Sequence, residues 1–171
     1  HLTDMQYNQD NKPRLIMMLG NTLGAFDPLK FPGQLDTMMR PQDFLLLDGE
    51  LFSPETLAGY DNPINRQFAF GPLSSVGLSE PDDGTLHFAN EIDNRQPGLY
   101  RIRKHFQVAR DLNIMLAGET VRLLSDTQIE MSWSYKYDRD ALVGLITSSG
   151  MQLAAEYAST DKRFLTLLAK K

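Results

Sequence analysis

The chain has 171 residues, of which 42% are hydrophobic and 23% charged, as in an ordinary globular protein of one domain. Cysteine is absent, which excludes disulfides, thiolate metal sites and cysteine nucleophiles. The net charge of −5 gives no basic surface for a nucleic acid, and no apolar run spans a bilayer, so we expect no nucleic-acid partner, no membrane partner and a cytoplasmic location.

The first predicted element is a strand in RLIMMLG, directly after Pro13. A continuous apolar run between a proline and a glycine is typical of a strand buried on both faces, although a buried helix segment would show the same run. The loop GNTLGAF follows, from Gly20 to Phe26. Its glycines allow a ligand to approach the backbone, and Asn21 and Thr22 offer polar contacts. On residue types alone, however, a tight turn needing glycine for its geometry is the better explanation of the loop.

The next stretch, DPLKFPGQLDTMMRPQ, predicts a short helix with Asp27 as N-cap, broken by Pro32 and Gly33 and stopped by Pro41. A second apolar run from Asp43 to Phe52 predicts another strand. Strand, helix and strand in this order form a βαβ unit, so we expect the two strands to be parallel in one sheet. Ligands of such sheets bind beyond the carboxyl ends of the strands, where the GNTLGAF loop and the end of the second run would lie.

The middle of the chain has a different residue pattern. Four prolines between residues 53 and 83 indicate loops and short helices, and the stretches that follow indicate antiparallel strands. A hairpin turn is predicted at Ala117 to Glu119. His87 and His105 fall on these strands without an acidic cluster, so we expect a surface or structural role for each and no metal site.

The C-terminal part of the chain again shows the helix and strand patterns of the first part. Leu142, Leu145 and Ile146 share one face of a predicted helix, which Gly150 ends. Two short antiparallel strands follow, beginning near Met151 and Arg163. The sequence therefore predicts an α/β sheet that is interrupted by an α+β insertion.

Four stretches resemble one family in order and spacing. LGNTLGAFDP is similar to the GSTIGNF loop of the histidine-specific, S-adenosylmethionine (SAM)-dependent methyltransferases of ergothioneine biosynthesis. LLLDGELFSPETLAGYDNP resembles a later strand of that family with its AYDDP segment, SWSYKYDRDAL resembles the TExSxKY segment, and DKRFLTLLA resembles the final strand. The similarity covers almost the whole chain but only the C-terminal half of the family's fold.

The resemblance implies the C-terminal part of a Rossmann-like methyltransferase sheet with an inserted α+β substrate-binding domain. Residues 1–52 would supply sheet strands and the loop, 53–133 the insertion, and 134–171 a helix and an antiparallel strand pair. The family's first half holds most of the cofactor, so we expect a truncated piece with an incomplete SAM pocket. An unpaired sheet edge would then be open to self-association.

The resemblance also assigns site residues. Gly20, Thr22 and Gly24 match the loop beside cofactor and substrate. Tyr60 matches the tyrosine that contacts the carboxylate of the substrate, and Ser134 matches the serine that contacts its imidazole. Lys136 and Tyr137 match the KY of the TExSxKY segment. No residue is assigned to the catalytic step itself, and a small-molecule amine is the expected substrate.

Two positions depart from the family pattern. Ala25 stands where the family has an asparagine that binds the substrate carboxylate, and Ser132 stands where it has an imidazole-binding glutamate. Glu130 lies two residues earlier, a spacing that keeps a strand residue on the same face about 6–7 Å away, so it is a candidate replacement.

These departures favour an N-methyltransferase that acts on an amino-acid-like amine other than histidine, one that is bulkier or less polar. They also permit a non-catalytic binding or regulatory module that keeps the fold. Without the resemblance, an unrelated α/β enzyme using the GNTLGAF loop for another ligand fits the residues as well.

Overall fold

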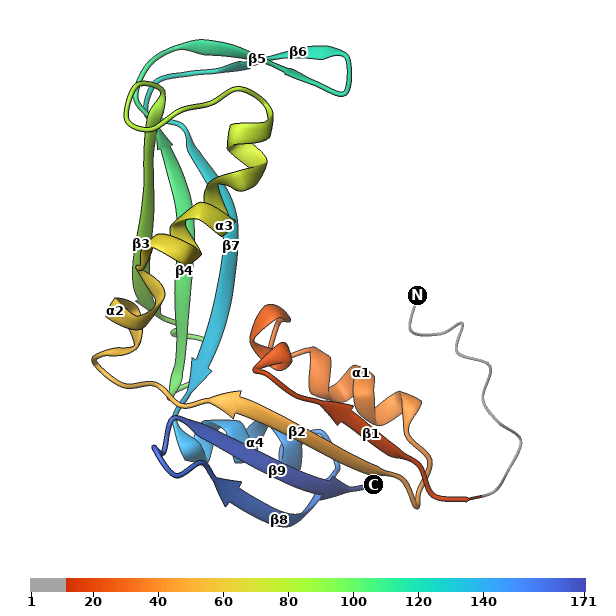
Figure 1. Cartoon of the computed structure of the whole chain (residues 1–171). Coiled ribbons are helices and arrows are strands. Elements are labelled where there is room, and N and C mark those ends of the chain that lie inside the picture. The colour runs from red at the N-terminus through yellow and green to blue at the C-terminus, as the bar shows by residue number, and fades with distance from the viewer. Residues whose placement is uncertain (1–11) are drawn as a thin grey trace.

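The structure is a computed structural model that describes residues 12–171, so residues 1–11 at the start of the first predicted division lie outside it. Two sheets meet end to end, and a small hairpin extends from the far end of the second sheet (Figure 1). No helix within the described residues combines the length and the apolar character that a bilayer crossing requires.

The first sheet has four strands: β1 (Leu15–Met18), β2 (Phe44–Glu50), β8 (Gln152–Ala158) and β9 (Phe164–Lys170). Their order is β1-β2-β9-β8, with β1 parallel to β2 and β9 antiparallel to both of its neighbours. The predicted parallel pairing of the first two strands and the predicted antiparallel pair at the end of the chain are therefore confirmed.

Helices α1 (Phe31–Met38) and α4 (Arg139–Ser148) share one hydrophobic core with the strands. The core side of the sheet includes Leu45, Leu47 and Leu167, and α4 contributes the three apolar residues predicted to share a face. The prediction that Pro32 and Gly33 break the first helix is wrong. Both lie in the first turn of α1, where a proline removes no helical hydrogen bond.

Asp27 is not the N-cap of α1. The helix begins after Lys30, and the Asp27 carboxylate instead accepts the Leu29 N–H at 3.1 Å in the preceding turn. The helix ends at Met38, before the predicted stop at Pro41.

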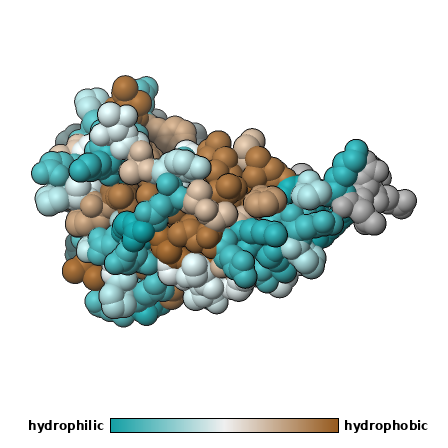
Figure 2. Space-filling view, turned by 90° about the horizontal axis from the view of Figure 1, so that it is seen from below, coloured by the Kyte–Doolittle hydropathy of each residue, from teal (hydrophilic) through white to brown (hydrophobic). Residues whose placement is uncertain are grey.

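The opposite face of this sheet is open. Leu15 is 55% exposed and Met17 is 60% exposed, while Ile16 and Met18 on the other side of β1 pack against the core. The expectation that this strand is buried on both faces is therefore wrong, because both helices that pack on the sheet within residues 12–171 lie on one side. Figure 2 shows apolar side chains gathered at the centre of the surface seen from below.

The second sheet is antiparallel and consists of β3 (Gly84–Ile92), β4 (Leu99–Val108) and β7 (Gln128–Tyr137), in the order β3-β4-β7. Helix α3 (Pro63–Ser75) lies along one face of it, and the short α2 (Thr56–Tyr60) precedes α3 (Figure 1). Leu73, Leu86 and Phe106 form the second core between helix and sheet.

The hairpin consists of β5 (Leu112–Leu116) and β6 (Glu119–Leu123). Ala117 and Gly118 form its turn with φ values of 51° and 86°, the left-handed pair typical of a two-residue hairpin loop. The predicted turn is confirmed.

The junction of the two sheets positions the candidate site. The 3₁₀ helix η2 (Thr22–Ala25), which follows β1, packs against β7, and Leu51 at the end of β2 forms a parallel bridge with Tyr137. The carboxyl ends of the two parallel strands therefore meet the last residues of β7.

Candidate functional site

The loop after β1 folds back onto the carboxyl end of β2. Gly20 and Asn21 have positive φ values of 75° and 54°, a region that glycine and asparagine tolerate well. Their N–H groups donate to the two Asp48 carboxylate oxygens at 2.9 and 2.6 Å. The Thr22 hydroxyl donates to the Leu19 carbonyl oxygen at 2.6 Å, so its proton is used inside the loop.

The Asn21 side chain connects this loop to two strands. Its Nδ2 donates to Ser134 Oγ on β7 at 3.1 Å, and its Oδ1 accepts the Glu50 N–H at 3.0 Å. Gly24 is buried against β7, where an added Cβ would lie 2.9 Å from the Tyr135 carbonyl oxygen. Close packing within the protein is thus sufficient to require glycine at position 24.

A buried ion pair lies beside the loop. The Lys136 side chain is fully buried, and its Nζ lies 2.9 Å from Glu50 Oε2, whose side chain is 5% exposed. Lys136 Nζ also donates to Tyr60 Oη at 2.6 Å and to Ser134 Oγ at 2.8 Å. Arg163 reaches the other Glu50 oxygen at 3.0 Å. Two basic side chains therefore neutralise one buried carboxylate.

The hydrogen-bond directions decide what this cluster can offer a ligand. Ser134 Oγ accepts from Lys136 and from Asn21, so its own proton is left for Tyr60, with which it interacts, or for a ligand. The Tyr60 hydroxyl donates to Glu50 at 2.9 Å and accepts from Lys136, which leaves one lone pair and no proton. Ser134 thus keeps a donor role and Tyr60 an acceptor role, toward each other or toward a ligand.

The charges keep these roles fixed near neutral pH. Burial alone would raise the pKa of Glu50, but hydrogen bonding and charge from Lys136, with Arg163, bring that pKa below its ordinary value. Glu50 therefore stays ionised. Burial raises the pKa of Tyr60 to about 12, and the nearby Glu50 carboxylate adds to the rise. The phenol therefore stays neutral.

The structure brings together only part of the predicted set. Tyr60 and Ser134 share the Lys136 ammonium as a hydrogen-bond partner. Ser132 is exposed further along β7. Of the loop residues that the resemblance singled out, Gly20, Thr22 and Ala25 are exposed and Gly24 is buried.

Glu130 does not lie on the face of Ser132. Across the sheet, Lys104 pairs with Ser132 but the next residue, His105, pairs with Glu130, so Met131 is the extra residue of a β-bulge. Glu130 therefore points to the opposite face, where it pairs with Arg103 at 3.3 Å. The expectation that Glu130 replaces the missing glutamate from the same face is wrong, because the bulge reverses the alternation.

Sequence reasoning did not identify Glu50, Arg163 or the hydrogen-bonding role of Lys136. Glu50 carried a usable signal, because an acidic residue that ends a buried apolar strand needs a cationic partner. Arg163 lies just before β9, more than 100 residues along the chain, and nothing in its local sequence points to Glu50.

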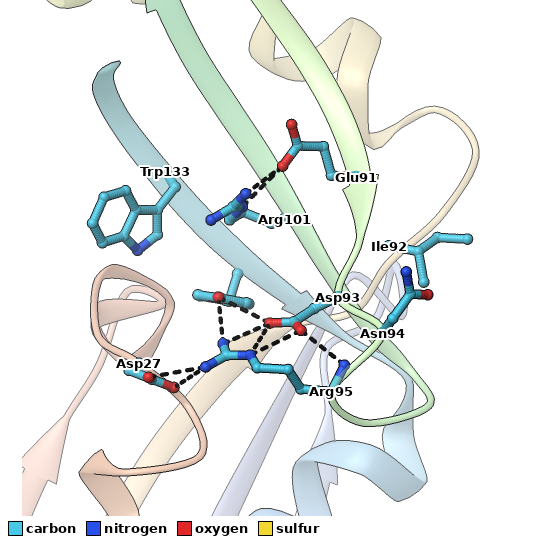
Figure 3. A pocket seen from close by; sticks show the side chains of 9 residues that line it. Asp27, Glu91, Ile92, Asp93, Asn94, Arg95, Arg101 and Trp133 are labelled. Carbon is cyan, nitrogen blue, oxygen red and sulfur yellow. Dashed lines mark hydrogen bonds and ion pairs between the residues drawn. The ribbon is translucent and has the colours of Figure 1, made fainter. Parts of the chain in front are cut away.

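The other face of the second sheet carries a cavity of about 410 Å³ near the η2 loop. Figure 3 shows Arg95 between Asp27 and Asp93, and Arg101 against Glu91. Trp133 and Tyr135 provide the aromatic lining of the cavity. The charges of this cavity are already paired with one another within the protein.

His87 and His105 face each other on this side, with ring centroids 5.4 Å apart. Burial, followed by the charge of Arg103, lowers the pKa of His105. No group of three or more metal-ligating side chains occurs in the part of the chain that the structure describes. A structural role for the pair stays a prediction.

The carboxyl end of β1 suits one side of a ligand that is partly apolar. No atom lies within 4 Å of where a Cβ would stand on Gly20, and the exposed apolar side chains Leu19 and Phe26 flank the loop. An open backbone between apolar side chains is compatible with a partly apolar nucleoside ligand.

Comparisons with solved structures give methyltransferases at low similarity. A SAM-dependent methyltransferase from Clostridium acetobutylicum ATCC 824 has 9% identity and a TM-score of 0.44, over 95% of this chain and 61% of that one. The CcbJ methyltransferase from Streptomyces caelestis has 11% identity and a TM-score of 0.40, over 94% of this chain and 63% of that one. The glycopeptide N-methyltransferase MtfA in complex with S-adenosyl-L-homocysteine has 9% identity and a TM-score of 0.40, over 91% of this chain and 53% of that one.

The chain thus spans less than two thirds of the length of each of these proteins. No curated protein matches the sequence significantly. A sequence profile of one family, described as histidine-specific methyltransferase, SAM-dependent, matches residues 2–171. Because this match covers nearly the whole sequence, the chain belongs to the histidine-specific, SAM-dependent methyltransferase family.

Proposed function

We propose that this chain forms the substrate side of a SAM-dependent N-methyltransferase that acts on an amino-acid-like amine other than histidine. The observation that supports this most directly is the state of Ser134. Its hydroxyl is held by two donors beside the loop that follows β1, and its own proton can turn from Tyr60 to a ligand. Because the chain belongs to this family, the alternative hypothesis of an unrelated α/β enzyme no longer applies.

In this proposal the four-stranded sheet is the C-terminal part of a Rossmann-like methyltransferase sheet, and the chain between β2 and α4 is an inserted substrate-binding domain. The sheet order supports the proposal, because β3, β4 and β7 form a sheet of their own that meets the end of β2 at the bridge between Leu51 and Tyr137. Our boundary at residue 133 falls inside β7, so an insertion made of whole strands would end at Tyr137.

The proposed cofactor contacts are Gly20, Thr22 and Gly24, of which Gly20 has the open backbone. When bound, SAM supplies a methyl group on a positive sulfonium, which the lone pair of the substrate amine takes as the sulfur–carbon bond breaks. The Tyr60 lone pair can accept an N–H of that amine and so orient its nitrogen. Ser134 can donate to an acceptor on the same substrate.

A non-catalytic binding or regulatory module is the second candidate. Ala25 and Ser132 support it, since both lack the hydrogen-bonding groups of the family pattern, and both are exposed here. Such a module would bind an amine and transfer no methyl group.

The same two positions lead us to expect poor use of histidine. A buried polar group left without its partner costs about 1–3 kcal/mol. Two lost contacts should therefore weaken histidine binding by about one to four powers of ten. Methyl transfer by the whole protein should be screened over amino acids and related amines, beside the Ala25→Asn/Ser132→Glu double variant.

We expect the unmodified protein to prefer another amine and the double variant to gain activity on histidine. Equal methylation of histidine by both proteins would show that the two substitutions are neutral. Binding of an amine without any methyl transfer would favour the non-catalytic module.

A further inference from the structure

Lys104 is a half-buried cation on the same face of the second sheet as the candidate substrate contacts. It lies on β4 directly across from Ser132 on β7. Its Nζ lies 5.6 Å from the centroid of the Phe88 ring and 5.8 Å from that of Tyr60. Within residues 12–171, no carboxylate pairs with Lys104, and its Nζ donates no hydrogen bond.

The neighbouring cations on this face are already neutralised. Lys136, 4.5 Å from the centroid of the same Tyr60 ring, pairs with Glu50. Arg66 on α3 pairs with Asp61 at 2.8 Å. Lys104 is different, because only aromatic rings compensate its charge, and burial lowers its pKa accordingly.

A partly desolvated ammonium without an anion is a ready binding site for one. The ring contacts hold it in place, and the Ser132 hydroxyl opposite can donate a further hydrogen bond to the same anion. The single charge of Lys104 matches one carboxylate.

We propose that Lys104 and Ser132 bind a carboxylate at the far end of the substrate side chain, so that the substrate is an acidic amino-acid-like amine. The inference rests on the proposed function, because it takes Tyr60 as the contact for the amine and Ser134 as the donor to an acceptor at the same end of the substrate. Ser132 and Ser134 are two residues apart on one strand, a rise of about 6–7 Å. That span fits a side chain of glutamate length.

The proposal changes the expected chemistry of the substrate. The substitution of the family's glutamate by Ser132 alone indicated a bulkier or less polar amine, whereas Lys104 makes the same place cationic. A cationic side chain would be repelled there, which gives a second physical reason against histidine in its charged form.

The test compares L-glutamate with L-glutamine, which have nearly the same shape and differ by one charge. Methyl transfer by the whole protein and binding by calorimetry should both be measured for the unmodified protein and for Lys104→Met, Lys104→Arg and Lys170→Met. Lys170→Met is the matched control, because it removes an exposed lysine at the end of β9. Thermal unfolding of each variant shows whether it is folded.

We expect the unmodified protein to prefer glutamate over glutamine by about tenfold or more, as a charge-assisted contact allows. Lys104→Met should bring that ratio near one. Lys104→Arg and Lys170→Met should keep the preference.

Equal use of glutamate and glutamine by the unmodified protein would overturn the assignment of Lys104 and leave the proposed methyltransferase standing. So would a preference that survives in folded Lys104→Met. If no amine is bound or methylated by any of the proteins, the proposed function itself fails, and the inference fails with it.

Discussion

Lys136 is fully buried, and burial lowers its pKa, while the adjacent Glu50 carboxylate favours the charged form. Removing it by Lys136→Met would leave the buried Glu50 carboxylate with Arg163 alone and the Tyr60 oxygen without its donor. Breaking a buried pair from one side costs about 3–5 kcal/mol. We expect urea unfolding to show a loss of that size in the free energy of unfolding.

The matched comparison is Arg163→Met, which removes the other cation from the same carboxylate. The Arg163 side chain is 61% exposed, so water replaces much of what is lost, and the loss should be less than half as large. Equal losses in the two variants would mean that the burial of Lys136 has no special importance.

Protonation of Asp43 should lower the stability of the protein in acid. The buried Asp43 carboxylate accepts the Arg14 N–H and the Arg14 Nε–H, each at 2.9 Å, and the Arg40 N–H at 2.8 Å. The hydrogen bonds from the Arg14 side chain, against the cost of burial, lower the pKa of Asp43 to about 2. An unfolded aspartate has a pKa near 4.

Because the folded pKa is the lower one, the stabilisation is complete above about pH 4 and is lost as the pH falls toward 2, a change of about 2 kcal/mol. Asp43→Asn should therefore flatten the fall of unfolding free energy between about pH 4 and pH 2, measured by urea unfolding at several pH values. The exposed Asp82→Asn should keep the slope of the unmodified protein. A slope unchanged in Asp43→Asn would contradict the assignment.

At the scale of elements, the position of η2 against β7 depends on one glycine. A Cβ at Gly24 would lie 2.5 Å from Asn21 Nδ2 and 2.9 Å from the Tyr135 carbonyl oxygen, so Gly24→Ala should push the loop away from β7. We expect a loss of about 1–3 kcal/mol in stability, as for other overpacked sites. The amide shift of Ser134 in NMR spectra should also change, because its hydrogen bond to Asn21 would be strained.

Gly33→Ala is the matched control. It adds the same methyl group inside α1, where no atom lies within 4 Å, and alanine is about 0.5–1 kcal/mol better than glycine in a helix. This variant should be as stable as the unmodified protein or slightly more. A Gly24→Ala protein that behaves like Gly33→Ala would show that the contact between loop and strand is loose.

The elements could be predicted where local patterns determine them. The runs LIMM and FLLLDGE are apolar enough to identify β1 and β2, and the loop between the last two strands is short enough to force their antiparallel pairing. The bulge at Met131 has no local pattern, because it depends on how β7 pairs with β4. This is why the face of Glu130 and the place of Lys104 opposite Ser132 were found only in the structure.

Which faces of a strand are buried also could not be predicted from the sequence. An apolar run shows that a strand prefers to be covered, but not that anything covers it. Leu15 and Met17 are as apolar as Ile16 and Met18, yet only the latter two face helices in the structure. The sequence pattern therefore predicted the strand correctly, but its prediction that the second face is buried was wrong.

At the scale of the whole molecule, the first sheet ends in an edge with an apolar face. β1 pairs with β2 alone among residues 12–171, and Leu15, Met17 and Leu19 are about half exposed or more. An unpaired edge with apolar side chains is a site for association with another chain. We therefore propose that the chain, as given, self-associates through β1.

Analytical ultracentrifugation over a range of concentrations should show this self-association, and a lysine at the apolar face should oppose it by placing a charge at the contact. Met17→Lys should shift the protein toward monomer with little loss of stability, because Met17 is already 60% exposed. Tyr157→Lys is the control at the other edge of the same sheet, on β8, where the side chain is 61% exposed. If Tyr157→Lys rather than Met17→Lys dissociates the protein, the contact lies at β8, and a protein that is monomeric at all concentrations would contradict association through either edge.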